Sequence, residues 1–139
     1  MYLLDTNVIS EIRRAKFGKC NTGVLAWIKG IQPSQIYTST VVLMEIERGV
    51  LSMERKDVPQ GQILRTWFEE QVKTTFKDQT FGLDEQTAHL CAQLHIPYHA
   101  PENDAWIAAT AKQHNLILVT RNIKDFENFG VKLLNPFVE

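Results

Sequence analysis

The sequence has few cysteines and no long apolar run. Its two cysteines, Cys20 and Cys91, lie far apart and match no metal-binding spacing. We therefore expect free thiols, as in a reducing cytoplasm, and not a disulfide framework. No stretch approaches the roughly 18 apolar residues of a membrane helix, and no basic segment followed by an apolar one marks a secretory signal. These absences predict a cytoplasmic protein with no membrane-bound part.

A surplus of basic residues is also lacking. The chain has 15 Lys and Arg against 16 Asp and Glu, for a net charge of −1. Proteins held to nucleic acid mainly through phosphate contacts usually carry a basic surplus, so any such contact must be local. The 7 glycines and 5 prolines give no sign of disorder, and 139 residues suit one domain of common size.

What the sequence does contain is an alternation of short apolar runs and helical patterns. The runs that predict strands are residues 2–4, 36–39, 81–83, 116–119 and 131–134. Amphipathic or small-residue stretches separate them, and residues 53–59 form a polar break too short to divide domains. The pattern predicts an α/β fold, a parallel sheet of about five strands with helices on both faces.

Three acids fall where such a fold places its ligands. Asp5 directly follows the first strand, and open α/β sheets bind ligands beyond the carboxyl ends of their strands. Glu45 emerges from the edge of an apolar helix face, and Asp104 opens a helix rich in alanine. Each also has an ordinary structural interpretation: Asp5 as a helix N-cap, Glu45 as a partner of Arg48, and Asp104 as a favourable charge at a helix start.

The chemistry follows if these acids share one crevice. Should the first and fourth strands be neighbours where the strand order reverses, Asp5 and Asn122 would meet, and Glu45 and Asp104 would approach from helices. Clustered carboxylates repel one another unless a cation lies among them. Mg²⁺ suits such oxygen ligands and supports phosphoryl chemistry. A zinc site is not predicted, because the histidines show no closed ligand spacing.

A small basic cluster follows the first helix. It contains Arg13, Arg14, Lys16 and Lys19 around Phe17. Such a cluster is either a solvated loop or a phosphate contact near the Asp5 end of the sheet.

Taken in order, the motifs resemble those of a known family. They are Leu4-Asp5-Thr6-Asn7, Glu45, Asn103-Asp104 with the alanine-rich helix, Val119-Thr120-Arg121-Asn122, and Asp125-Phe126. The set is similar to that of the PIN-domain ribonucleases, and within them of the VapC-type toxins of toxin–antitoxin pairs, FitB-like subgroup. The resemblance spans nearly the whole chain and implies a single PIN-like domain over residues 1–139, with a three-layer fold.

The resemblance implies a ribonuclease that depends on Mg²⁺ or Mn²⁺. Asp5, Glu45 and Asp104 would be the catalytic, metal-binding acids. Residues that would orient these acids or water are Thr6, Asn7, Thr120 and Asn122. Many family members carry a fourth acid where this chain has Asn122, and an amide brings no charge. Asp125 either replaces that acid in part or only caps a turn.

The resemblance also implies partners. These are an RNA substrate such as tRNA, a VapB-like antitoxin that fills a groove at the active site, and a second copy in a homodimer. Residues that would contact RNA are Arg13, Arg14 and Arg121. The stripe of Trp67 and Phe68 and the helix at residues 24–31 are either partner-facing surfaces or plain core.

Two alternatives remain open at this stage. One is a PIN-like binding or regulatory module with weak or no catalysis, for which Asn122 is the sequence support. The other is a phosphatase with Asp5 as covalent nucleophile, which would want an acid at position 7, where this chain has Asn7.

Overall fold

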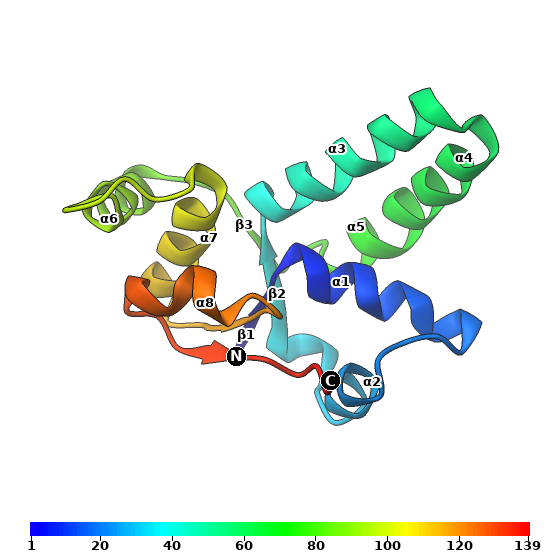
Figure 1. The fold of residues 1–139 in the computed structure, drawn as a ribbon, viewed down its shortest axis with the longest axis horizontal. Helices are drawn as coiled ribbons and strands as arrows, with labels where there is room; N and C mark the ends of the chain where they lie inside the picture. Colours follow the sequence, from blue (N-terminus) through cyan, green and yellow to red (C-terminus); the bar gives the residue numbers. More distant parts are fainter.

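A parallel sheet forms the centre of the computed structural model, which describes all residues from 1 to 139. Its five strands run in the order β3-β2-β1-β4-β5, and every neighbouring pair is parallel (Figure 1). The strands are β1 Tyr2–Leu4, β2 Ile36–Ser39, β3 Thr80–Phe81, β4 Ile117–Val119 and β5 Leu133–Leu134. The predicted five-stranded parallel sheet is confirmed, with the third and fifth strands shorter than expected.

Helices cover both faces of the sheet. They are α1 Thr6–Arg13, α2 Thr22–Lys29, α3 Thr40–Lys56, α4 Val58–Trp67, α5 Lys73–Thr75, α6 Glu85–Leu94, α7 Glu102–Gln113 and α8 Ile123–Phe126. In Figure 1, α6, α7 and α8 lie on one side of the sheet, whereas α1, α2 and the long hairpin of α3 and α4 lie on the other. No helix has both the length and the apolar character that crossing a membrane requires.

Side-chain caps fix where several helices begin. Asp5 accepts a hydrogen bond from the Thr6 amide, and the Ser39 hydroxyl accepts one from the Val42 amide. Asp84 in the same way caps α6. Such caps satisfy amides that have no partner within the helix. Because Asp5 and Ser39 end β1 and β2, each cap also marks a sharp turn from strand to helix at the same edge of the sheet.

Residues 53–59, which the sequence predicted to form a polar break, are almost entirely helical, so that prediction is wrong. Helix α3 continues to Lys56 and α4 begins at Val58, so only Asp57 separates them. The Asp57 carboxylate caps α4, and Arg65 of α4 pairs with Glu54 of α3 at 2.9 Å. The charged residues that looked like a solvated linker hold two antiparallel helices together.

The reversal of strand order lies between β1 and β4. Tyr2, Leu3 and Leu4 align with residues 117–119, and the Asp5 amide donates to the Val119 carbonyl at 3.0 Å. This register brings the carboxyl end of β1 beside that of β4. The residues that follow the two strands, Asp5 and Thr120, are therefore neighbours, although 114 positions lie between them.

Candidate active site

Asp5 is held in place by hydrogen bonds from three directions. One carboxylate oxygen accepts from the Thr6 amide at 2.8 Å, and the other accepts from the Thr120 hydroxyl at 2.8 Å. Asn7 Nδ2 approaches the second oxygen at 3.4 Å. Burial raises the pKa of the Asp5 carboxyl, with a smaller contribution from the charge of Glu45, and the three hydrogen bonds oppose that rise. The predicted site residues Thr6, Asn7 and Thr120 all contact Asp5.

Glu45 joins this group from α3. Its Oε1 accepts a hydrogen bond from the Thr6 hydroxyl at 2.6 Å, and its Oε2 accepts one from Asn103 Nδ2 at 3.2 Å. These two donors come from α1 and α7, on opposite sides of the sheet. Both oxygens of Glu45 are thus engaged, so its carboxylate has a defined orientation toward the strand ends.

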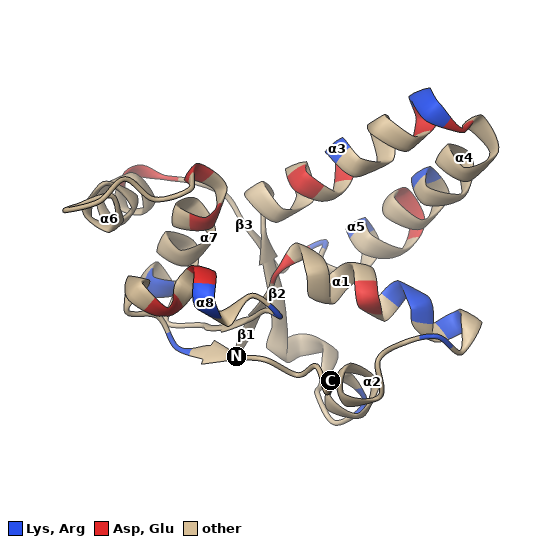
Figure 2. Cartoon of the chain, in the orientation of Figure 1, with Lys and Arg blue, Asp and Glu red and all other residues tan.

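Asp104 lies one residue beyond Asn103 in the first turn of α7. Its carboxylate makes no hydrogen bond or ion pair within the protein. Burial raises the pKa of Asp104 to about 6, and the charges of Asp5, Asp125 and Glu45 add to the rise. Asp104 on α7 is therefore within electrostatic reach of acids that follow β1 or lie on α3 and α8. Figure 2 shows acidic segments on α3, α7 and α8 around the end of β1.

The donor set suits a hard divalent cation. None of these four carboxylates forms a salt bridge with a lysine, arginine or histidine of the chain. Mg²⁺ and Mn²⁺ prefer oxygen ligands, and a cation of this kind would offset the repulsion between such carboxylates. Asp104 offers two such oxygens, and Asp5 and Glu45 keep free lone pairs in fixed orientations. These residues therefore fit the metal that the sequence implied.

Comparison with known proteins places this site in a family. The sequence profile of the PIN domain matches residues 2–132. The chain belongs to the PIN-domain family. Toxin FitB of Neisseria gonorrhoeae is 34% identical over 99% of this chain and 99% of its own length. VapC ribonuclease Y4jK of Sinorhizobium fredii is 29% identical over 99% of this chain and 98% of its own.

Solved structures agree with the sequence comparison. The crystal structure of FitAcB from Neisseria gonorrhoeae matches this PIN domain with a TM-score of 0.87 and 31% identity, over 98% of both chains. A toxin–antitoxin complex from Klebsiella pneumoniae matches with a TM-score of 0.69 and 25% identity, over the whole of both chains. The similarity thus extends across the sheet and the helices that carry the four acids.

Two residues concern the fourth acid that many members of the family carry. Asn122 stands at its position, and Asp125 follows three residues later. The Asn122 amide donates to the Thr120 hydroxyl at 3.1 Å, while its side chain makes no hydrogen bond. Asp125, on the following helix, lies close enough to raise the pKa of Asp104. In this PIN domain, Asp125 of α8 thus brings a negative charge to bear on Asp104, whereas Asn122 brings none.

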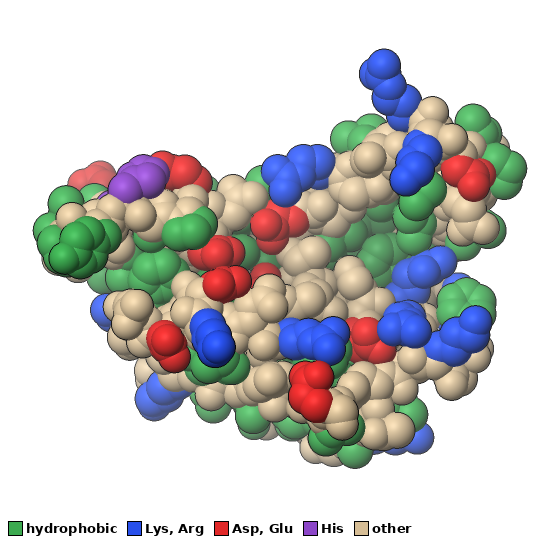
Figure 3. Space-filling model, viewed as in Figure 1, with side chains coloured by type: hydrophobic (Ala, Val, Ile, Leu, Met, Phe, Trp, Pro, Cys, Tyr) green, Lys and Arg blue, Asp and Glu red, His purple; other side chains and the backbone are tan.

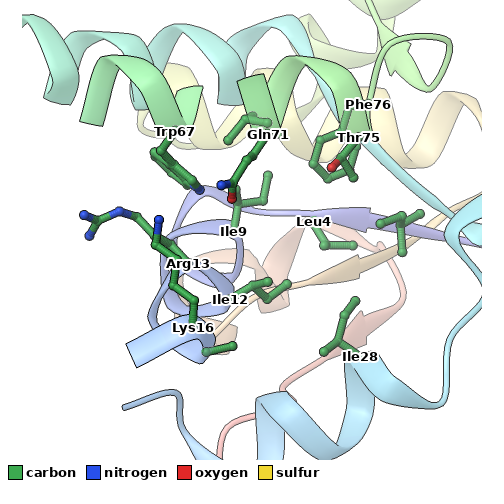
Figure 4. A pocket seen from close by; sticks show the side chains of 13 residues that line it. Leu4, Ile9, Ile12, Arg13, Lys16, Ile28, Trp67, Gln71, Thr75 and Phe76 are labelled. Carbon is green, nitrogen blue, oxygen red and sulfur yellow. The ribbon is translucent and has the colours of Figure 1, made fainter. Parts of the chain in front are cut away.

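Beside the acids, α1 forms one wall of an apolar cavity of about 310 Å³ (Figure 4). Ile9, Ile12 and Arg13 line it from α1, Ile28 lines it from α2, and Trp67 lines it across from them. The Arg13 guanidinium lies 5.7 Å from the centre of the Trp67 ring, and its buried Nε has no hydrogen-bond partner. The structure thus directs Arg13 toward this cavity and leaves an unused donor there.

The predicted stripe of Trp67 and Phe68 divides between two environments. Phe68 is part of the core, and Trp67 is buried as well but contributes its ring to the cavity wall. The same holds on α2, where Val24 is fully buried and Ile28 lines the cavity. Both segments therefore carry a core residue and a residue that lines the cavity.

A cluster of His95, His99 and Glu102 was not predicted from the sequence. His95 and His99 stack with ring centres 4.6 Å apart, and their Nε2 atoms lie 3.6 and 3.4 Å from the Glu102 oxygens. These residues lie close in sequence, but His95 and His99 are in the connection between α6 and α7, so no helical or strand periodicity predicts that they meet Glu102. His95 Nδ1 accepts the Ala100 amide at 3.0 Å, so the proton of the neutral ring is on Nε2. The ring therefore presents a donor toward Glu102, and the cluster anchors the start of the helix that carries Asp104.

Asn103 was not among the predicted site residues, although it is part of the motif that contains Asp104. The signal was its position directly before an acid at a helix start. Only the approach of α3 to α7 reveals that its amide holds Glu45.

Proposed function

We propose that this chain is a ribonuclease toxin that hydrolyses phosphodiester bonds in RNA with the help of Mg²⁺ or Mn²⁺. The observation that carries the proposal is the grouping of Asp5, Glu45 and Asp104 at the strand ends. Thr6 bonds to both Asp5 and Glu45, Asn103 beside Asp104 holds Glu45, and no cationic side chain pairs with any of the three acids. The relatives named as a toxin and as a ribonuclease support the same activity. A single-stranded loop of a structured RNA such as tRNA would suit an open acidic site.

The chain's own residues hold and orient the acids. Thr120 and the Thr6 amide fix Asp5, while the Thr6 hydroxyl and Asn103 fix Glu45. Asp104 contributes oxygens that no protein donor occupies. When bound, a divalent cation offsets charge on the scissile phosphate and makes water more acidic for attack. No serine, cysteine or histidine nucleophile is required, because water would be the attacking group.

The apolar cavity beside α1 is the proposed docking site of a VapB-like antitoxin. Its walls from α1, α2 and α4 would take apolar side chains of a partner segment, and such a segment would lie next to the acids. Arg13 Nε would donate to a carbonyl or carboxylate oxygen of that segment, because it is buried with no acceptor inside the chain. The toxin–antitoxin complex among the similar structures supports a partner of this kind.

A homodimer is proposed as well. The loop between α6 and α7 exposes 76% of Ile96 and 84% of Tyr98. Large apolar side chains exposed next to each other favour a protein contact. This loop lies on the far side of α7 from the cavity, on the helix layer opposite α1 and α2, so both contacts could form together.

The experiment that tests the activity is cleavage of total cellular RNA by protein prepared without antitoxin. The wild type is assayed with Mg²⁺, with Mn²⁺ and with excess chelator, beside Asp5→Asn and Asp104→Asn. Fragments that need the metal and vanish in both variants support the nuclease and its site together. Intact RNA with a folded wild type would overturn the proposal and favour a binding module.

A further inference from the structure

The basic cluster that follows α1 is split between two separate surfaces. Arg13 and Lys16 line the apolar cavity described above. Arg14 and Lys19 instead line a polar cavity of about 270 Å³ together with Arg121, which follows β4. The two cavities share no residue. Arg13 and Arg14, adjacent at the end of α1, therefore line different cavities.

The polar cavity is built around cations. Glu11 lies at its edge with a side chain only 11% exposed, and its two oxygens are engaged, one with Arg14 at 3.3 Å and one with the Asn21 amide at 2.8 Å. The Lys19 ammonium has no acceptor in the chain. The lining thus holds one acid, Glu11, and three cationic side chains, so it carries a surplus of positive charge.

Arg121 links this cavity to the acids. Its amide donates to Asn7 Oδ1 at 3.1 Å, and it directly follows Thr120, the residue that holds Asp5. Its guanidinium lies 4.9 Å from the centre of the Phe137 ring, which orients the planar donor group. Glu139 also contacts Arg121 at 3.5 Å, but its side chain is 77% exposed, so solvent weakens that pair.

A space-filling view shows the same arrangement. Acidic side chains gather in the middle of the face, and a row of basic side chains runs beside them toward the end of α1 (Figure 3). A polyanionic strand with one phosphate at the acids would carry its neighbouring phosphates along this row.

We propose that the cavity of Arg14, Lys19 and Arg121 binds a backbone phosphate of single-stranded RNA next to the one that is cleaved. This inference rests on the proposed nuclease function, whose substrate it positions. Arginine forks and a lysine point charge are the donors that phosphates favour, and such contacts position a strand without reading its bases. Arg13, by contrast, lines the apolar cavity and not this one, so the proposed contact does not include it.

The test measures RNA binding apart from cleavage. A labelled single-stranded oligoribonucleotide of mixed sequence is titrated with antitoxin-free protein in excess chelator, over a range of salt concentrations. Lys19→Gln is compared with Lys29→Gln, which removes an exposed lysine from the end of α2 that lines neither cavity. Losing one phosphate contact on a single strand lowers the slope of log K against log salt by about 0.7, or about fivefold in affinity near 0.1 M salt.

The expected result is that lower slope in Lys19→Gln and a wild-type slope in Lys29→Gln. Arg14→Gln combined with Lys19→Gln should lower the slope by about 1.4. Equal slopes for wild type, Lys19→Gln and Lys29→Gln would overturn the phosphate cavity even if the wild type cleaves RNA. A wild type that binds with the expected slopes but never cleaves would instead overturn the nuclease and leave the cavity standing.

Discussion

The Thr6 hydroxyl donates a 2.6 Å hydrogen bond to Glu45 Oε1 and so joins the first residue of α1 to the middle of the acidic site. The other oxygen of Glu45 is held by Asn103, the residue before Asp104. One carboxylate therefore ties α1, α3 and α7 together at the strand ends. Its orientation depends on donors from both faces of the sheet, which makes these donors sensitive targets for mutation.

Thr6→Val should lower activity without unfolding the protein. Valine has the shape of threonine and keeps the backbone amide that donates to the Asp5 carboxylate. It lacks the hydroxyl that donates to Glu45, so the Glu45 carboxylate is then free to rotate. Residues that orient metal-binding side chains typically contribute about 10- to 100-fold to metal affinity or activity. Metal titration of RNA cleavage measures the change, and Thr6→Ser should restore it. Equal loss in both variants would show that the hydroxyl is not what matters.

Asp104→Asn should stabilise the metal-free protein at pH 7.5. Asp104 has a pKa of about 6 in the folded state, above the ordinary value of about 4, so its ionisation disfavours folding. The folded state binds the Asp104 proton more tightly than the unfolded state does, and this adds to the free energy of unfolding. The contribution is fully present below about pH 4 and is lost as the pH rises through about 6. After allowance for solvent screening we expect a gain of about 1–2 kcal/mol for the variant.

Chemical denaturation in chelator at several pH values measures that gain. It should be present at pH 7.5 and disappear near pH 4. A variant that is less stable than the wild type at pH 7.5, or a difference that does not change with pH, would contradict the crowding of acids around Asp104.

Asp125→Asn should weaken binding of Mn²⁺, because Asp125 supplies charge that Asn122 lacks. The matched control is Glu127→Gln, which removes an exposed acid two positions along the chain. Calorimetric titration with Mn²⁺ should give a weaker affinity for Asp125→Asn by about tenfold and an unchanged one for Glu127→Gln. If both variants match the wild type, Asp125 is only a surface residue of α8.

Ala15→Phe should block the antitoxin while sparing cleavage. Ala15 lines the apolar cavity, and an aromatic ring there would occupy the space proposed for the partner segment. Antitoxin affinity should fall by about tenfold or more, about 1.4 kcal/mol, with RNA cleavage unchanged. Ala26→Phe, on the exposed face of α2, is the control for added bulk. Full inhibition of Ala15→Phe at wild-type antitoxin concentrations would exclude this cavity as the docking site.

Ile96→Asp should convert the proposed homodimer to a monomer. A charge at the centre of an apolar contact is left without a partner when the interface forms. Light scattering after size exclusion measures the mass, and Leu51→Asp, which changes an exposed apolar residue of α3, is the control. A dimer that survives Ile96→Asp but not Leu51→Asp would place the interface on the α3–α4 hairpin.

Much of the architecture could be predicted from the sequence, because its signals are local. Alternating apolar runs and helical patterns predicted the parallel sheet. Short-range caps at Asp84 and Ser39, which likewise depend on residue type and local order, fix the starts of α6 and α3. The polar break predicted at residues 53–59 was wrong because local composition does not show that α3 and α4 pack together as a hairpin. A run of charged residues has the composition of a linker, and only the pairing of Arg65 with Glu54 across two helices makes it part of a packed element.

For the site, the sequence by itself determined which acids are present and that Asp5 and Asn122 follow strands, since these facts depend on residue type and local order. The tertiary structure decided what depends on strand order and helix packing. It brings Thr120 onto Asp5 and Asn103 onto Glu45, and it turns Arg13 and Arg14 toward different cavities. Neighbours in sequence diverge because a helix rotates successive side chains by about 100°, whereas residues far apart in the chain meet where parallel strands end at the same edge of the sheet.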